Sequence, residues 1–224
     1  MEGTRLLILQ QLQKQRTGTV GGLAKGIGLA PATIRRHLDI LQRDRLVSFR
    51  EIRKKTGRPE HSFYLTDEGH EALPKGYDQL LGMVVNEIAD LTPADMTGKS
   101  GQELLPLLFL RLSQRVAGRY DADLTGMGIG RRLQTLMGHL QTQDFFPEAS
   151  VSGGALRISL HNCPYRAVAL QNKAVCAFDL GLISSLLALD VTREECISDG
   201  DAGCMYSAAV GEPAEQDILA SLPA

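Results

Sequence analysis

The first 162 residues of this 224-residue chain contain no cysteine, and all four cysteines lie in the remainder. The sequence also lacks a Cys-x-x-Cys pair, which argues against a zinc finger, a zinc ribbon and a thioredoxin-like thiol pair. No apolar run approaches the roughly 20 residues that a membrane-spanning helix needs. The N-terminus shows no signal-peptide cleavage pattern. We therefore expect a cytoplasmic protein whose thiols stay reduced.

Acidic residues are scarce in the first quarter of the chain. Residues 1–60 contain 13 Lys and Arg against 5 Asp and Glu, whereas residues 61–224 contain 11 against 21. The overall composition, 43% hydrophobic and 22% charged, is that of a chain able to bury a core. The asymmetry favours a nucleic-acid-binding N-terminal part and a second part with another task.

Three short helices are predicted in the basic part. The segment RLLILQQLQKQ has apolar residues at helical spacing, and Thr19 can cap a short helix in TVGGLAKGIG. Pro31 suits the first turn of a third helix, whose buried stripe is Ile34, Leu38 and Leu41. Two helices joined by a tight turn, the second with outward arginines, form a helix-turn-helix pattern.

A basic hairpin follows the third helix. Residues 46–65 alternate as two strands do, and RKKTGRPE forms the turn between them. A basic hairpin in this place is typical of a wing that lies near DNA phosphates, while the preceding helix contacts base edges. The predicted DNA-contacting side chains are Thr33, Arg35, Arg36, His37 and Arg43 on the helix and Arg53, Lys54, Lys55 and Arg58 on the turn.

The segments PATIRRHLDILQRDRLV and TGRPEHSFYLTDEGHEALPKGY resemble the winged helix-turn-helix of ArsR/DeoR-like bacterial repressors. The resemblance covers about residues 5–77 and implies operator binding. One departure is Ala30, which stands where a capping Ser or Thr is expected.

The rest of the chain predicts a second domain of mixed class. Residues 77–91, 101–119 and 126–143 carry apolar stripes at helical spacing, and we expect core packing for most of these stripes and a dimer interface for part of them. Strands are predicted around Gly153-Gly154 and around SDGDAG, with a helix over residues 166–189 between them. We therefore predict an α+β protein with a winged helix-turn-helix domain (1–76), a connecting and dimerisation helix with its linker (77–98), and a cysteine-containing sensor and dimerisation domain of antiparallel strands and helices (99–224).

The four cysteines fall at a strand-to-helix junction (Cys163), inside the predicted helix (Cys176) and on the two sides of the last hairpin (Cys196 and Cys204). Their wide spacing requires a folded domain to bring the thiolates together. Four thiolates can hold zinc or an iron–sulfur cluster, and Pro164 after Cys163 is a weak pointer to the latter. Simple burial explains any one cysteine equally well. His161 is a possible substitute ligand, although a surface or strand-end histidine is the simpler interpretation.

The segments HNCPYRAVA and REECISDGDAGCMY, with 12 residues between Cys163 and Cys176, are similar to SufR, the iron–sulfur-sensing repressors of bacterial Suf operons. The resemblance covers nearly the whole chain, although the last hairpin is also similar to 4-vinyl-reductase-like sensing domains. It implies a homodimeric repressor with a [4Fe-4S] cluster, whose ligands match best at Cys163, Cys176 and Cys204. Cys196 is the candidate fourth ligand.

Two rival functions stay open. One is a winged-helix regulator whose second domain binds zinc, forms a reversible disulfide or binds an aromatic effector. The other is an enzyme with Cys163 near His161 as a thiol nucleophile, but no acidic partner is evident, so we expect no enzymatic activity.

Overall fold

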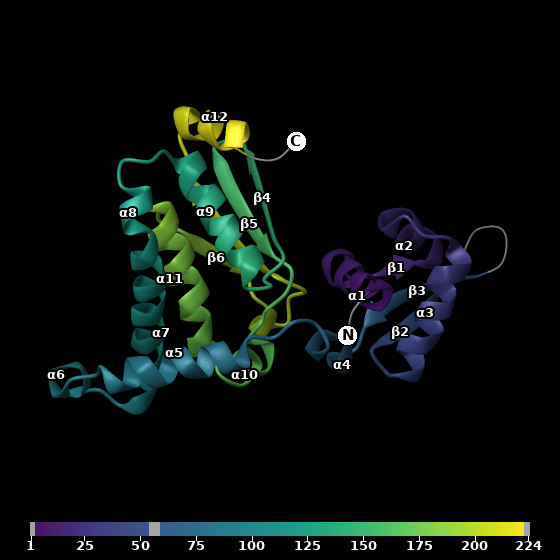
Figure 1. Ribbon diagram of the computed structural model, residues 1–224, viewed down its shortest axis with the longest axis horizontal. Helices are drawn as coiled ribbons and strands as arrows, with labels where there is room; N and C mark the ends of the chain where they lie inside the picture. Colours follow the sequence, from purple (N-terminus) through teal and green to yellow (C-terminus); the bar gives the residue numbers. More distant parts are fainter. Residues whose placement is uncertain (1–2, 54–58, 222–224) are drawn as a thin grey trace. The chain divides into compact units, whose positions relative to one another are not determined.

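The computed structural model describes residues 3–53 and 59–221. The chain divides into two compact units, Met1–Pro74 and Lys75–Ala224 (Figure 1). Each unit combines helices with an antiparallel sheet, which confirms the predicted α+β class. Among the described residues, no helix has both the length and the apolarity needed to cross a bilayer.

The N-terminal unit is a winged helix-turn-helix. Its elements are α1 (Thr4–Gln15), β1 (Gly18–Thr19), α2 (Val20–Ile27), α3 (Pro31–Arg43), β2 (Val47–Ile52), β3 (Glu60–Leu65) and α4 (Asp67–Glu71). The strand order is β1-β3-β2. The two-residue strand β1 escapes sequence analysis because it is too short to show alternation. It adds a third strand to the predicted hairpin.

Local sequence signals set the helix boundaries in this unit. The Thr19 hydroxyl accepts a hydrogen bond from the Gly22 amide at 3.1 Å, so the predicted cap of α2 is confirmed. Gly28 ends α2 with a φ of 76°, a left-handed conformation that glycine adopts without strain. Ile34, Leu38 and Leu41 are all fully buried, as predicted for the inner face of α3.

A close approach explains the glycine in the YLTDEG segment. The Thr66 hydroxyl caps α4 by accepting a hydrogen bond from the Gly69 amide at 3.0 Å. A Cβ atom at Gly69 would lie 1.9 Å from the carbonyl oxygen of Leu46, far closer than van der Waals contact allows. Only glycine therefore allows α4 to pack against the start of the wing.

The C-terminal unit contains α5 (Tyr77–Ala89), α6 (Pro93–Met96), α7 (Gly101–Ala117), η1 (Gly118–Tyr120), α8 (Asp121–Leu124), α9 (Ile129–Thr142), β4 (Pro147–Ser152), β5 (Ala155–Leu160), α10 (Arg166–Gln171), η2 (Lys173–Val175), α11 (Cys176–Leu187), β6 (Thr192–Glu195), η3 (Ile197–Asp199), β7 (Cys204–Ala209) and α12 (Glu212–Ser221). Its antiparallel sheet has the order β4-β5-β7-β6.

One face of this sheet packs against helices. In β5 and β7 the buried side chains alternate with less buried ones, so each strand presents a single face to the core. Figure 1 shows α7, α9 and α11 gathered on one side of the sheet. Helices α7 and α11 approach closely at Gly181, because glycine has no Cβ. A Cβ at this position would lie 2.3 Å from the hydroxyl oxygen of Ser113.

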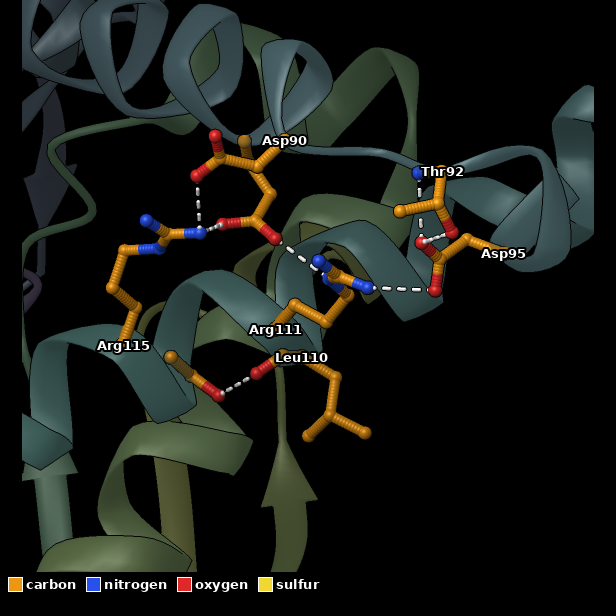
Figure 2. Close-up of polar contacts among 8 residues, drawn as sticks. Asp90, Thr92, Asp95, Leu110, Arg111 and Arg115 are labelled. Atoms are coloured by element: carbon orange, nitrogen blue, oxygen red, sulfur yellow. Dashed lines mark hydrogen bonds and ion pairs between the residues drawn. The ribbon is translucent and has the colours of Figure 1, made fainter.

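A buried carboxylate fixes α5 on α7. Glu87 is 1% exposed, and its two oxygens lie 2.6 Å from Arg111 Nε and 2.9 Å from Arg115 Nη2. Figure 2 shows both guanidinium groups reaching outward to further carboxylates, Arg111 to Asp95 and Arg115 to Asp90. The network holds the N-terminal helix of this unit against its core.

The predicted helix over residues 166–189 is wrong as one continuous element. Asn172 has extended backbone angles, and its side-chain oxygen accepts a hydrogen bond from the Ala174 amide at 3.0 Å. This local bond competes with helical pairing and separates α10 from α11. Cys176 consequently opens α11 rather than lying inside a long helix.

Candidate functional site

The recognition helix α3 presents a polar face. Thr33, Arg35, Arg36 and Arg43 are exposed, whereas His37 is only partly exposed. The Nδ1 atom of His37 is buried and has no hydrogen-bond partner in the part of the chain that the structure describes, so this ring belongs partly to the packing of the unit. Ala30 precedes α3 without a side-chain cap, which leaves the first amides of the helix available.

The wing is the antiparallel hairpin of β2 and β3. The register pairs Val47 with Leu65 and Phe49 with Phe63. Arg53 is exposed just after β2. Three of the predicted contact residues, Lys54, Lys55 and Arg58, lie outside the described residues.

A groove of about 700 Å³ lies between α3 and the wing. Its lining includes Arg35, Asp39, Gln42 and the rings of Phe49 and His61, which stack with centroids 4.0 Å apart. Sequence analysis missed His61, because a lone histidine in a strand gives no signal until its cross-strand neighbour is known. The groove combines a guanidinium, an amide and aromatic surface, all of which can contact nucleic acid.

The second candidate site is a cluster of buried sulfur atoms in the C-terminal unit. Cys163 follows β5, Cys176 opens α11, Cys196 follows β6 and Cys204 opens β7. All four are free thiols, and each is 7% exposed or less. Pairing of Leu160 with Cys204 in the β5–β7 ladder brings two of these segments side by side.

Three of the sulfurs form a row with Cys196 at its centre. The Cys196 Sγ atom lies 3.9 Å from the Sγ atoms of both Cys176 and Cys204. For comparison, two thiolates on one tetrahedral zinc ion are about 3.8 Å apart, given Zn–S bonds of about 2.3 Å. Within residues 3–53 and 59–221, however, no group of three or more His, Cys, Asp or Glu has the arrangement of a ready-made metal-ion site.

Polar groups from the hairpin surround the row. The Ser198 hydroxyl lies 3.1 Å from the Cys196 sulfur, and the Ile197 amide donates to the Cys204 sulfur at 3.5 Å. The Cys196 amide donates to Asp201 at 2.9 Å, which shapes the turn between the two cysteines. Arg193 donates to the Cys176 carbonyl at 3.1 Å. The hairpin therefore supplies hydrogen bonds that suit thiolate sulfur.

The thiols differ in acidity. Hydrogen bonds with Cys176 and Cys204 lower the pKa of Cys196, and the same bonds, together with burial, raise the pKa of both neighbours. Burial and the charge of Asp179 raise the pKa of Cys163 to about 12. One negative charge is thus favoured at the centre of the row. Cys163 does not have the environment of an activated nucleophile.

His161 is engaged elsewhere. Its Nε2 atom lies 3.0 Å from a carboxylate oxygen of Glu148 on the neighbouring strand. This ion pair fits the interpretation of His161 as a strand-end residue rather than a ligand. Sequence analysis missed Asp179 and Arg193, both of which act electrostatically on the cysteines.

Comparison with known proteins supports the N-terminal site. Residues 2–48 match the family model described as bacterial regulatory protein, arsR family. No curated protein gives a significant match to the chain. A solved structure, Bacillus subtilis PadR in complex with operator DNA, is 18% identical, covers 84% of this chain and 99% of its own, and has a TM-score of 0.29. With its winged fold and the family match, the N-terminal unit is the DNA-binding domain of a transcriptional regulator.

Proposed function

We propose that the chain is a homodimeric cytoplasmic repressor whose operator affinity depends on an iron–sulfur cluster held by the C-terminal cysteines. The observation that carries this proposal is the approach of three free, buried thiols from three separate segments, Cys176, Cys196 and Cys204, through two sulfur–sulfur distances of 3.9 Å, with the free, buried Cys163 in the same unit. The proposed controlled genes are those of iron–sulfur cluster assembly, in line with the resemblance of the cysteine segments to SufR.

The donor chemistry fits the cluster. Cys176, Cys196 and Cys204 would hold it with Cys163, because thiolate sulfur is the usual protein ligand of iron–sulfur centres. When bound, the cluster would supply iron–thiolate bonds that join the start of α11 to the last hairpin. Without these bonds, the same segments are held by apolar packing and by the Arg193 hydrogen bond to the Cys176 carbonyl.

The chain's own residues connect this site to α5. Helix α11 starts at Cys176 and packs through Gly181 on Ser113 of α7. Helix α7 in turn holds α5 through Arg111, Arg115 and the buried Glu87. A change in how α11 is held can therefore reach α5 through contiguous packing, which is the physical requirement for coupling two sites.

An exposed apolar stripe on α5 supports the homodimer. Leu81, Val85 and Ile88 recur at i, i+4 and i+7 and are 64%, 56% and 54% exposed. A helix-turn-helix regulator commonly binds two half-sites related by two-fold symmetry, so a second copy of this chain is the proposed occupant.

The test is an anaerobic purification followed by an absorption spectrum and a count of iron and sulfide per chain. We expect a broad band at about 400 nm that bleaches in air, and about four irons per chain. Operator binding is then compared before and after loss of the cluster, with the quadruple Cys→Ser variant as the matched control. A colourless protein that takes up no iron and sulfide on reconstitution would eliminate the cluster.

Zinc is a second candidate at the same cysteines. The specific observation in its favour is the pair of 3.9 Å distances, which match the separation of two thiolates on one zinc ion. A colourless protein that carries one zinc per chain, and loses operator affinity when the zinc is removed, would identify this alternative.

A further inference from the structure

Asp179 carries a buried carboxyl group. It lies on α11 one turn after Cys176, so both side chains project from the same face of the helix. The residue is 4% exposed. Among the described residues its Oδ1 atom has no hydrogen-bond partner. Burial raises the pKa of this carboxyl group to about 7, so its charged form is costly unless a cation binds it.

The carboxyl group lies amid the cysteines. Its charge raises the pKa of Cys163, Cys176 and Cys204, and the charge of Cys196 in turn acts on Asp179. The cation acting on Asp179 is Arg193, whose guanidinium also acts on Cys176 and Cys196. Lys75 acts on Cys163 and Lys173 acts on Cys196, so Arg193 is not the sole cation that acts on the cysteines.

We propose that Asp179 is an oxygen ligand of the metal centre at the cysteines, so that this centre has a mixed sulfur–oxygen ligand set. The proposal rests on the proposed function and deepens it, because it names a ligand that is not a cysteine. Iron accepts carboxylate oxygen as well as thiolate sulfur, and replacement of cysteine by another ligand type is known at iron–sulfur centres.

The geometry explains why a carboxylate would serve here. The three sulfurs of Cys176, Cys196 and Cys204 follow one another in a row, while no distance of this kind joins Cys163 to the row among the described contacts. Asp179 acts on Cys163 more strongly than Cys196 does. The carboxyl group projects from the face of α11 that carries Cys176, so it is a candidate for the further donor that the centre needs.

The test uses the full-length chain, reconstituted anaerobically with ferrous iron and sulfide. Asp179→Asn keeps the shape of the side chain but removes its charge, and Asp179→Cys replaces the carboxylate with a thiolate. Asp199→Asn is the matched control. Asp199 lies on the hairpin between Cys196 and Cys204, its side chain is 48% exposed, and it pairs with Lys173. The readouts are iron per chain and the rate at which a chelator removes that iron.

We expect the chelator to remove iron from Asp179→Asn about tenfold faster or more, a loss of the size seen when a metal site loses a supporting group. Asp179→Cys and Asp199→Asn should keep iron as wild type does. Metal-free Asp179→Asn should unfold at the same temperature as wild type or higher, because an unpartnered buried charge has been removed. If the carboxyl group only supported the fold, metal-free Asp179→Asn would unfold at a lower temperature than wild type and would not release iron faster through loss of a ligand.

The two proposals fail separately. If wild type takes up no iron and sulfide, the proposed cluster is eliminated. If wild type loads and Asp179→Asn retains iron equally long, or Asp179→Cys is no better than Asp179→Asn, the ligand assignment is overturned and the cluster stands.

Discussion

Arg111 donates a hydrogen bond from Nε to the carboxylate of Glu87 at 2.6 Å, and this carboxylate is almost wholly excluded from water. The side chain of Arg111 is 36% exposed and that of Arg115 is 48% exposed, so both guanidinium groups keep access to solvent. The two sides of this network are therefore unequal. Loss of the two arginines would leave the charge of Glu87 buried and unpaired, whereas loss of the Glu87 carboxylate would leave the arginines accessible to water.

This asymmetry predicts unequal losses of stability. Replacing Arg111 and Arg115 together by Met should lower the free energy of unfolding by about 3–5 kcal/mol, since Glu87 is left buried and unpaired. Glu87→Gln should cost about 1–3 kcal/mol, because the arginines can be hydrated and keep Asp90 and Asp95. Urea unfolding of both variants measures the difference, with Arg131→Met on the exposed face of α9 as control. Equal losses would contradict the asymmetry.

The stripe on α5 predicts a variant that is monomeric but folded. Val85→Glu places a charge in the middle of the exposed apolar residues and should dissociate the proposed homodimer. Asn86→Glu is the matched control, because Asn86 is exposed and lies about 100° around the helix from Val85. Sedimentation velocity gives the oligomeric state. A dimer that survives Val85→Glu as well as Asn86→Glu would place the interface elsewhere.

The arginines that we predict to contact DNA should separate by role. Arg36→Ala on the recognition helix should cost about 1–3 kcal/mol on the operator and relax sequence preference. Arg53→Ala at the wing should weaken binding to operator and random DNA alike and reduce the slope of affinity against salt by about 1. Fluorescence anisotropy with both DNAs over a salt series measures these effects. The assignment of Arg36 fails if its loss is equal on both DNAs.

His139 predicts a pH dependence of stability in the C-terminal unit. Burial, with a smaller contribution from the charge of Arg119, lowers the pKa of this imidazole below its usual 6.5. The unfolded chain therefore binds more protons than the native one just below pH 6.5, so the free energy of unfolding falls as pH drops through this range.

Removal of the imidazole should remove this contribution. Wild type should lose more stability than His139→Gln between about pH 8 and about pH 5, since only wild type carries the histidine. Urea unfolding of both proteins at the two pH values gives the comparison. Parallel losses in the two proteins would exclude His139 as the titrating group.

Sequence analysis predicted the N-terminal unit well because its signals are local. The Thr19 cap, Pro31 in the first turn of α3 and the spacing of Ile34, Leu38 and Leu41 each act within a few residues of the chain. The wing is likewise a hairpin of neighbouring strands. Such features need no knowledge of distant contacts.

The cysteine site was predicted only in part, because it depends on long-range packing. The grouping of the cysteines in one unit was visible in the sequence, but their order in space was not. Asp179 was missed although a carboxylate three residues after Cys176, inside the apolar segment CAFDLGL, was a signal. The helix break at Asn172 was missed as well. The side-chain bond between Asn172 and the Ala174 amide that causes it is local, but the segment contains no proline or glycine at this point to indicate a break.

The position of Cys204 opposite Leu160 in the β5–β7 ladder has a consequence for biosynthesis. A nascent chain carries its first thiol 41 residues ahead of its last, and these thiols meet only after β5, β7 and α11 have all been made and paired. Metal capture at this site would therefore follow folding rather than guide it. A loaded site would therefore show that β5, α11 and β7 of the C-terminal unit had already been synthesised and folded together.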